Sequence, residues 1–155
     1  MKTLFTLLFT LLFVYPWQES NQSQEQPLAR GMYSYTGRFF SDNGTMSDQG
    51  MCSSFFANIY ENKLVITKQP LGSPQFVDTT YPYVGRDENG YRVYKLNDSD
   101  RFLVDSDYNL QHVLSSATYN GNVITNTRYE IEKGDHTQEC LEKMKSRLYD
   151  TPFYF

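Results

Sequence analysis

The sequence predicts an all-β fold, an antiparallel meander of about eight strands arranged as a barrel or a sandwich, with one C-terminal α-helix. Between residues 32 and 133, apolar and polar side chains alternate with a period of two, and short clusters of Asn, Asp and Gly interrupt the alternation. After Gly134 the apolar residues recur at helical spacing. The two periods indicate a sheet of hairpins followed by a single helix.

The first residues of the chain predict export. Lys2 precedes an apolar run over residues 4–15, which is typical of a secretory signal peptide, here assigned to residues 1–20. The run is shorter than the roughly 20 residues that a membrane-spanning helix needs, so we expect no stable membrane anchor after signal cleavage. Residues 21–31 are polar and predict a disordered leader before a single domain at 32–155. The expected location is secreted, periplasmic or extracellular.

Eight segments have the alternation of strands. In the clearest of them, Tyr33, Tyr35 and Phe39 share one face of the strand. The expected strands cover residues 33–39, 52–60, 64–68, 76–84, 91–96, 101–104, 110–119 and 123–131. Asn120-Gly121 predicts a two-residue type I′ hairpin between the last two, because both residues tolerate a positive φ. Pro82 has no N–H to donate, so the strand that contains it should be an edge or carry a bulge.

The helix is expected at residues 136–149. Asp135 can cap its N-terminus, with Gln138 three positions later, and Cys140, Leu141 and Met144 fall on one apolar stripe. In an exported chain, the two cysteines, Cys52 and Cys140, are most simply a disulfide that attaches the helix to the sheet. Closing a loop of about 88 residues would stabilise the fold by roughly 4 to 5 kcal/mol. The alternative is a pair of buried free thiols.

Charge excludes one class of partner. The net charge is −4, from 14 basic and 18 acidic residues, and no basic run is present, so nucleic acid is not an expected partner. The sequence contains no cofactor motif, and we expect no cofactor.

One weak metal candidate is present. Asp105, Asp107 and Asn109 match the first positions of a calcium loop, in which alternate oxygen-bearing side chains converge on the ion. The match ends there, because Leu110 replaces the Gly of the sixth position and Ser116 replaces the Glu of the twelfth. A tight hairpin turn selects the same residue types, and this interpretation is favoured.

No catalytic motif is visible. His112 lies in the middle of an expected strand and His136 at a helix N-terminus, and neither has neighbours in the sequence that form a catalytic set. Surface or capping roles are expected for both histidines. The alternative is a secreted hydrolase that uses His112 or two carboxylates from different strands, which need no fixed spacing in the sequence.

Aromatic content is unusual, with 13 Tyr and 11 Phe. Tyr suits recognition surfaces and ligand pockets, but cross-strand aromatic pairs also stabilise sheets. The outline of eight strands and a helix after a signal peptide resembles the calycins, such as lipocalins. Gly37-Arg38-Phe39 is a degenerate form of the lipocalin GxW motif, and the resemblance implies that Arg128 packs across Phe39. Phe39 stands where that motif has Trp, and no strand is expected after the helix, so the sequence departs from that family in both features.

A second alternative is a small outer-membrane β-barrel, because the chain ends in Phe153-Tyr154-Phe155 and such barrels tend to end in an aromatic residue. Several expected strands are shorter than the 9 to 11 residues that such barrels need. The sequence therefore favours a secreted, non-catalytic binding or interaction module. Its partner would be a small apolar molecule, a glycan or a protein.

Overall fold

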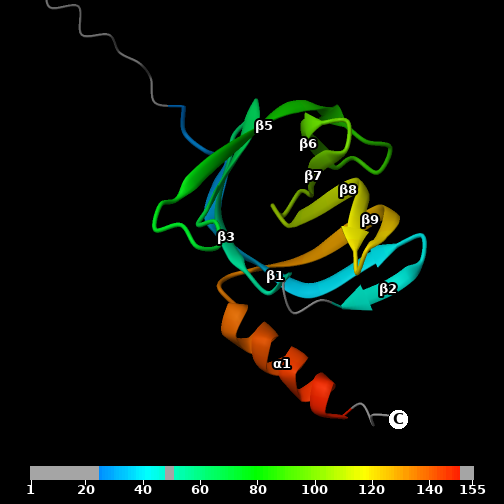
Figure 1. Ribbon diagram of the computed structural model, residues 1–155. Helices are drawn as coiled ribbons and strands as arrows, with labels where there is room; N and C mark the ends of the chain where they lie inside the picture. The colour runs from blue at the N-terminus through cyan, green and yellow to red at the C-terminus, as the bar shows by residue number, and fades with distance from the viewer. Residues whose placement is uncertain (1–24, 48–50, 151–155) are drawn as a thin grey trace, which may run out of the picture.

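The computed structural model describes residues 25–47 and 51–150, which form nine strands and one helix. The strands are β1 (Ala29–Ser41), β2 (Gly44–Ser47), β3 (Ser54–Ile59), β4 (Lys63–Lys68), β5 (Val77–Arg86), β6 (Arg92–Asn97), β7 (Asp100–Val104), β8 (Leu110–Tyr119) and β9 (Asn122–Lys133). Every neighbouring pair is antiparallel, and pairing of β1 with β9 closes eight strands into a barrel (Figure 1). The expected all-β class is confirmed, and the architecture is a barrel.

The ninth strand, β2, lies outside the ring and pairs only with the end of β1. It was not expected from the sequence. β1 also begins earlier than expected, because Ala29, Arg30 and Gly31 already pair with β3, within the segment assigned to the leader. The expected signal peptide at residues 1–20 lies outside the described residues, as does the C-terminal Phe153-Tyr154-Phe155.

The hairpin between β8 and β9 has the turn that the sequence predicts. Asn120 and Gly121 have φ values of 48° and 77°, and Tyr119 pairs with Asn122 directly across the turn. A two-residue turn with two positive φ values matches the right-handed twist of the flanking strands. The tight turn therefore fixes the register of the longest hairpin in the barrel.

Pro82 lies where one side of β5 has no partner. The ladder between β5 and β6 begins at Tyr83, whereas the ladder between β4 and β5 runs through Pro82 to Val77. The Tyr83 N–H donates toward β4, so the nitrogen of Pro82 faces the side on which β6 does not pair. A register shift follows between Tyr83 and Gly85, which agrees with the expected bulge. The barrel wall is consequently unpaired along the first half of β5.

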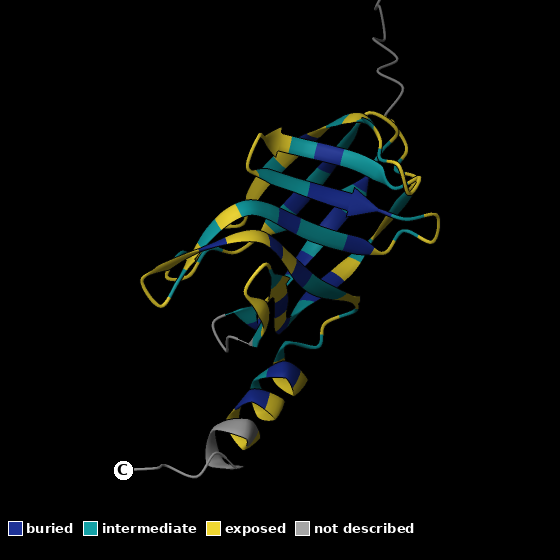
Figure 2. Cartoon of the chain, turned by 90° about the vertical axis from the view of Figure 1, so that its right-hand side faces the viewer, coloured by how far each residue is buried: buried dark blue, intermediate teal, exposed yellow. Residues whose placement is uncertain are grey.

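Aromatic and aliphatic side chains fill the barrel interior. The core contains Tyr33, Phe55, Ala57, Ile59, Leu64, Ile66, Tyr81, Tyr94, Phe102, Val104 and Leu110. Figure 2 shows buried and exposed positions alternating along the strands. The largest completely buried side chains are Tyr94, Phe39 and Phe102. The aromatic content of the sequence therefore serves packing to a large extent.

One end of the barrel is closed by tyrosines and an arginine. Tyr94 donates to the Tyr60 carbonyl at 2.7 Å, and Tyr33 donates to the Tyr108 carbonyl at 2.8 Å. The Arg92 guanidinium lies 4.7 Å from the centre of the Tyr83 ring. These bonds join the ends of β1, β3, β6 and the β7–β8 turn. We call this the closed end.

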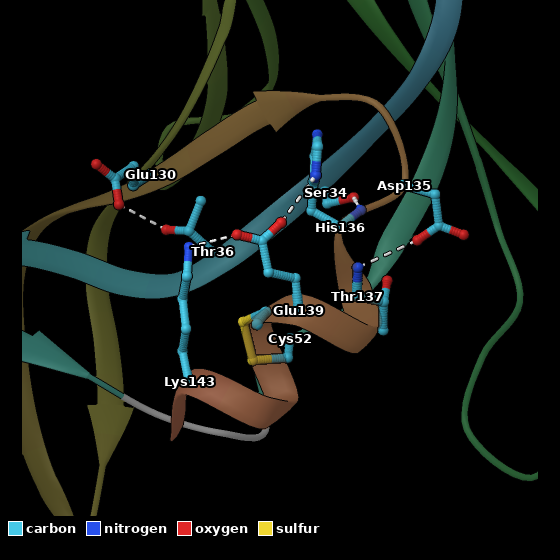
Figure 3. Close-up of a disulfide and its surroundings, with 10 residues drawn as sticks. Ser34, Thr36, Cys52, Glu130, Asp135, His136, Thr137, Glu139 and Lys143 are labelled. Carbon is cyan, nitrogen blue, oxygen red and sulfur yellow. Dashed lines mark hydrogen bonds and ion pairs between the residues drawn. A yellow bond between two sulfur atoms is a disulfide. The ribbon is translucent and has the colours of Figure 1, made fainter. Parts of the chain in front are cut away.

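The helix α1 (Thr137–Asp150) begins at the outside of the barrel and extends away from it (Figure 1), and a disulfide ties its N-terminal part to the barrel (Figure 3). Cys52 and Cys140 are bonded with a Cα–Cα distance of 5.6 Å, which confirms the expected pair. Met144 is buried beside them. The Asp135 carboxylate accepts a hydrogen bond from the Thr137 N–H at 3.2 Å, as expected for a cap. Within the part of the chain that the structure describes, no helix has the length and apolar character needed to cross a membrane.

The expected packing of Arg128 across Phe39 is wrong. Phe39 is buried in a second small core with Ile124 and Tyr129, whose ring centre lies 5.5 Å from that of Phe39. Arg128 is exposed and pairs with Phe40 on the outer face. Adjacent residues in a strand point to opposite faces, so Tyr129 takes the position beside Phe39 and Arg128 cannot.

Candidate functional site: a polar cluster near one end of the barrel

Three segments define the end of the barrel opposite the closed one, which we call the mouth. They are the loop between β4 and β5 (residues 69–76), the first residues of β5, and the turn between β6 and β7. The antiparallel register brings all three to one end, because β4 and β6 end where β5 and β7 begin. The unpaired stretch of β5 lies at this end.

A chain of hydrogen bonds runs through the barrel near the mouth. His112 Nδ1 lies 2.9 Å from the Tyr35 hydroxyl, and His112 Nε2 lies 2.8 Å from Asp100 Oδ1. The Tyr81 hydroxyl donates a longer bond of 3.4 Å to Asp100 Oδ2. The four residues come from β1, β5, β7 and β8, and we call them the polar cluster.

Aromatic rings enclose the imidazole of His112. The Phe102 ring stacks on it with a centroid distance of 4.4 Å and an interplanar angle of 5°, and the Tyr129 ring centre lies 5.5 Å away. The side chains of His112 and Asp100 are only 14% and 23% exposed. The expected surface role of His112 is therefore wrong. The inward face of β8 carries Leu110 and Leu114 as well, and His112 falls between them on the same side.

Burial determines the protonation of the two phenols. It raises the pKa of Tyr35 well above its ordinary value of 10.0, and the nearby Tyr81, Asp100 and Tyr129 raise it further. Burial also raises the pKa of Tyr81, with the Asp100 charge and its hydrogen bond adding to the effect. The Asp100 carboxylate only accepts hydrogen bonds, so His112 Nε2 is the donor in that pair, and in the tautomer with hydrogen on Nε2 alone, Nδ1 accepts from the Tyr35 hydroxyl. Every bond in the cluster then has one donor and one acceptor.

The mouth also exposes apolar side chains. Val77, Thr79 and Tyr81 share the inward face of β5, because they lie opposite Lys68, Ile66 and Leu64 in the ladder with β4, and Leu64 and Ile66 are core residues. Val77 is nevertheless 47% exposed. The neighbouring segments add further exposed apolar side chains at the same end, namely Leu71, Phe76 and Leu96. The inward face is therefore uncovered where it reaches the mouth.

A buried hydroxyl without a partner lies in the same layer. Asp100 pairs with Leu114 across β7 and β8, and Leu114 pairs with Thr127 across β8 and β9. Thr127 is completely buried, and its Oγ1 has no hydrogen-bond partner among the described residues. Such groups are rare in folded proteins.

The other candidate residues have local structural roles. Asp105 Oδ1 accepts the N–H groups of Asp107 and Asn109 at 2.9 and 2.8 Å, and Oδ2 accepts the Asn109 side-chain amide. These bonds hold the pKa of Asp105 below its usual value and build the β7–β8 turn, which is the favoured interpretation of that segment. No cluster of three metal-ligating side chains occurs within residues 25–47 and 51–150. His136 lies directly before α1 (Figure 3), and its Nε2 is 2.8 Å from the Lys133 carbonyl oxygen.

Sequence reasoning missed the polar cluster because its members lie far apart in the chain. Tyr35 and His112 are separated by 77 positions, and only closure of the barrel brings them together. No model of a protein family, no curated protein and no solved structure matches this chain. The one local signal was the position of His112 on the apolar face of its strand.

Proposed function

We propose that this protein is a secreted, non-catalytic binding module that takes a small amphipathic molecule at the mouth of the barrel. The observation that carries the proposal is the exposure of Val77, an inward-facing apolar residue, at the same end of the barrel as the Asp100 carboxylate. Small-molecule sites combine an apolar wall with a few placed polar groups. A carboxylate only accepts hydrogen bonds, so the polar group of the ligand should be a donor, and an ammonium group suits it best.

The side chains that fill the barrel interior limit how far a ligand can enter from the mouth. Phe102 and Phe55 lie with ring centres 6.2 Å apart, and Tyr81 and Phe102 with ring centres 5.0 Å apart, so aromatic side chains occupy the centre of the barrel. The ligand should therefore sit over the polar cluster at the mouth. A binding mode that threads an apolar chain along the whole axis is disfavoured.

The chemistry of the cluster favours binding over hydrolysis. The His112 side chain is only 14% exposed and its ring is stacked against Phe102, so a substrate has little access to the imidazole. The raised pKa of Tyr35 makes its phenolate, the form that could act as a nucleophile, scarce at neutral pH. The cluster orients a carboxylate, which is a binding role.

The disulfide supports the secreted part of the proposal. Cys52 and Cys140 are joined, and disulfides persist in oxidising compartments such as the periplasm and the extracellular space. Mass spectrometry of the protein from the culture medium would test export, because cleavage near residue 20 should remove the N-terminal segment. Recovery of the intact chain in the cytoplasm would contradict it.

The binding site can be tested with a neutral apolar fluorophore, N-phenyl-1-naphthylamine. We expect its fluorescence to rise on binding and to be displaced by dodecylammonium at lower concentration than by dodecanoate. Val77→Ser should weaken fluorophore binding by up to about tenfold, because the bound fluorophore would cover the exposed part of the Val77 side chain. The matched control is Val84→Ser, which changes an exposed Val at the other end of the same strand.

Two results would contradict the mouth as the binding site. One is the absence of any fluorescence change at micromolar protein. The other is an equal loss of affinity in Val77→Ser and Val84→Ser, which would place the fluorophore elsewhere on the surface.

A further inference from the structure

A second candidate site lies on the outer face of the barrel, between β8 and β9. The structure has a groove of about 370 Å³ there, within the range of small-molecule sites. Gln111 lines one side of the groove, Glu130 and Ile131 line the other, and Phe40 and Arg128 lie beside it. None of these residues belongs to the polar cluster or the mouth.

The groove exists because two strands separate. The ladder between β8 and β9 begins at His112 and Tyr129, so Leu110 and Gln111 have no partner in β9. Both residues still pair with β7, and Ile131 and Glu132 still pair with β1. The groove therefore lies where the pairing of β8 with β9 stops, while each strand stays paired with its other neighbour.

The end of the groove is also fixed. The β7–β8 turn closes it with Asp105 and Asn109, whose side chains are bonded to each other at 2.8 Å. The Lys133 ammonium donates to the Asp107 carbonyl and ties this turn to the end of β9. The groove is therefore bounded by β8 and β9 along its sides and by this turn at its end.

Two side chains in the groove have polar groups that could form hydrogen bonds with a ligand. Arg128 is exposed, and neither Arg128 nor Gln111 has a hydrogen-bond or ion-pair partner in the described part of the chain. Glu130 differs, because one of its oxygens accepts a bond from Thr36 at 2.6 Å and lies 3.9 Å from the Arg38 guanidinium. Among the described residues Arg128 therefore forms no ion pair, and its positive charge faces the groove without a bound carboxylate.

Phe40 adds an apolar platform. Its side chain points to the outer face, is 42% exposed, and lies opposite Arg128 in the ladder between β1 and β9. An exposed aromatic ring next to planar amide and guanidinium groups suits a ligand that has an apolar face and a polar edge. A sugar ring has this shape, with C–H groups on its face and hydroxyls at its edge.

We propose that the groove binds a sugar unit that carries a carboxylate, such as a hexuronate. Arg128 would hold the carboxylate through its two parallel N–H donors, Gln111 would bond ring hydroxyls, and Phe40 would pack against the face of the ring. The carboxylates of Glu130 and Asp105 favour this ligand over phosphate. They can accept hydrogens from sugar hydroxyls, whereas they would repel a dianion. The proposal is independent of the ligand at the mouth.

The experiment compares D-glucuronate, D-glucose and inorganic phosphate by saturation-transfer NMR and calorimetry on the full mature protein. We expect glucuronate to bind more tightly than glucose, and phosphate to bind least. Arg128→Gln should weaken glucuronate binding by about tenfold or more, because it removes the charge-assisted hydrogen bonds to the carboxylate, and it should remove the preference over glucose. Phe40→Ala should weaken both sugars.

The matched controls are Arg30→Gln and Val123→Ala, which change an exposed Arg and an exposed aliphatic side chain outside the groove. All four variants change exposed positions, so their melting temperatures should stay close to that of the parent. Absence of glucuronate binding would overturn the proposal. Phosphate binding as tight as that of glucuronate would overturn it in favour of a general anion site, and so would equal effects of Arg30→Gln and Arg128→Gln.

Discussion

His112 Nε2 lies 2.8 Å from Asp100 Oδ1, although the two residues belong to different strands and their backbones are not opposite each other in the ladder. Asp100 pairs with Leu114, and His112 pairs with Phe102, so the bond runs diagonally across β7 and β8. Tyr35 from β1 completes the link on the other ring nitrogen. The His112 imidazole thus connects β1, which closes the barrel by pairing with β9, to β7, which begins at the mouth.

Tyr35→Phe should lower the free energy of unfolding. The change removes the hydroxyl that donates to His112 Nδ1 and leaves an acceptor unpaired among aromatic rings. An unsatisfied buried group costs about 1 to 3 kcal/mol. Urea unfolding followed by far-UV circular dichroism would measure the loss. Tyr91→Phe is the control, because no partner of the Tyr91 hydroxyl is found in the described residues, and it should change stability by less than about 0.5 kcal/mol.

A double-mutant cycle of Tyr35→Phe with His112→Phe would isolate the interaction. We expect a coupling of about 0.5 to 3 kcal/mol for residues in contact within one network. A coupling of zero would mean that the two side chains contribute independently, and it would contradict the hydrogen bond between them.

Stability should fall at alkaline pH. Burial raises the pKa of Tyr35 and Tyr81 above the value of 10.0 that tyrosine has in the unfolded chain. Above about pH 10 the unfolded state loses these protons while the folded state keeps them, so the unfolded state binds fewer protons. The stabilisation is complete below pH 10 and is lost as the pH rises toward the folded-state pKa values. Thermal melting between about pH 8 and 11 would measure it, and Tyr35→Phe should reduce the slope.

The strands were predictable because the alternation of side chains and the turn residues are local signals. Asn120-Gly121 fixed one hairpin, and Gly134 marked the change from strand to helix. β2 escaped prediction because Gly44–Ser47 is short and has no apolar alternation. The choice between barrel and sandwich depended on the pairing of β1 with β9, which joins residues about 100 positions apart and has no local signature.

The candidate sites were less predictable for the same reason. The mouth depends on where the β5–β6 ladder begins, and the outer groove on where the β8–β9 ladder begins. Pro82 gave a local hint of the first opening. Nothing local indicated the second, because Leu110 and Gln111 read as ordinary strand residues, and the sequence does not show that the β8–β9 ladder begins only at His112.

Removal of the disulfide should destabilise the protein strongly. The bond closes a loop between residues 88 positions apart, and the chain-entropy model gives roughly 4 to 5 kcal/mol for a loop of this size. We expect a measured loss of about 2 to 5 kcal/mol for Cys52→Ser combined with Cys140→Ser, determined by urea unfolding. The parent protein treated with reductant should show the same loss, whereas reductant should leave the double variant unchanged. Full alkylation of both thiols in the untreated parent would contradict the disulfide.

Thr127→Val should stabilise the protein in the absence of ligand. Thr127 Oγ1 is completely buried and lacks a partner in the described part of the chain, and Val has nearly the same shape without the hydroxyl. Burying an unpaired hydroxyl costs about 1 to 3 kcal/mol, so the free energy of unfolding should rise by about 1 kcal/mol. Thr118→Val, at an exposed position on β8, is the control and should have little effect. A loss of stability in Thr127→Val would show that the hydroxyl makes a hydrogen bond in solution. If that loss appeared only with dodecylammonium present, the bond would be to the ligand at the mouth.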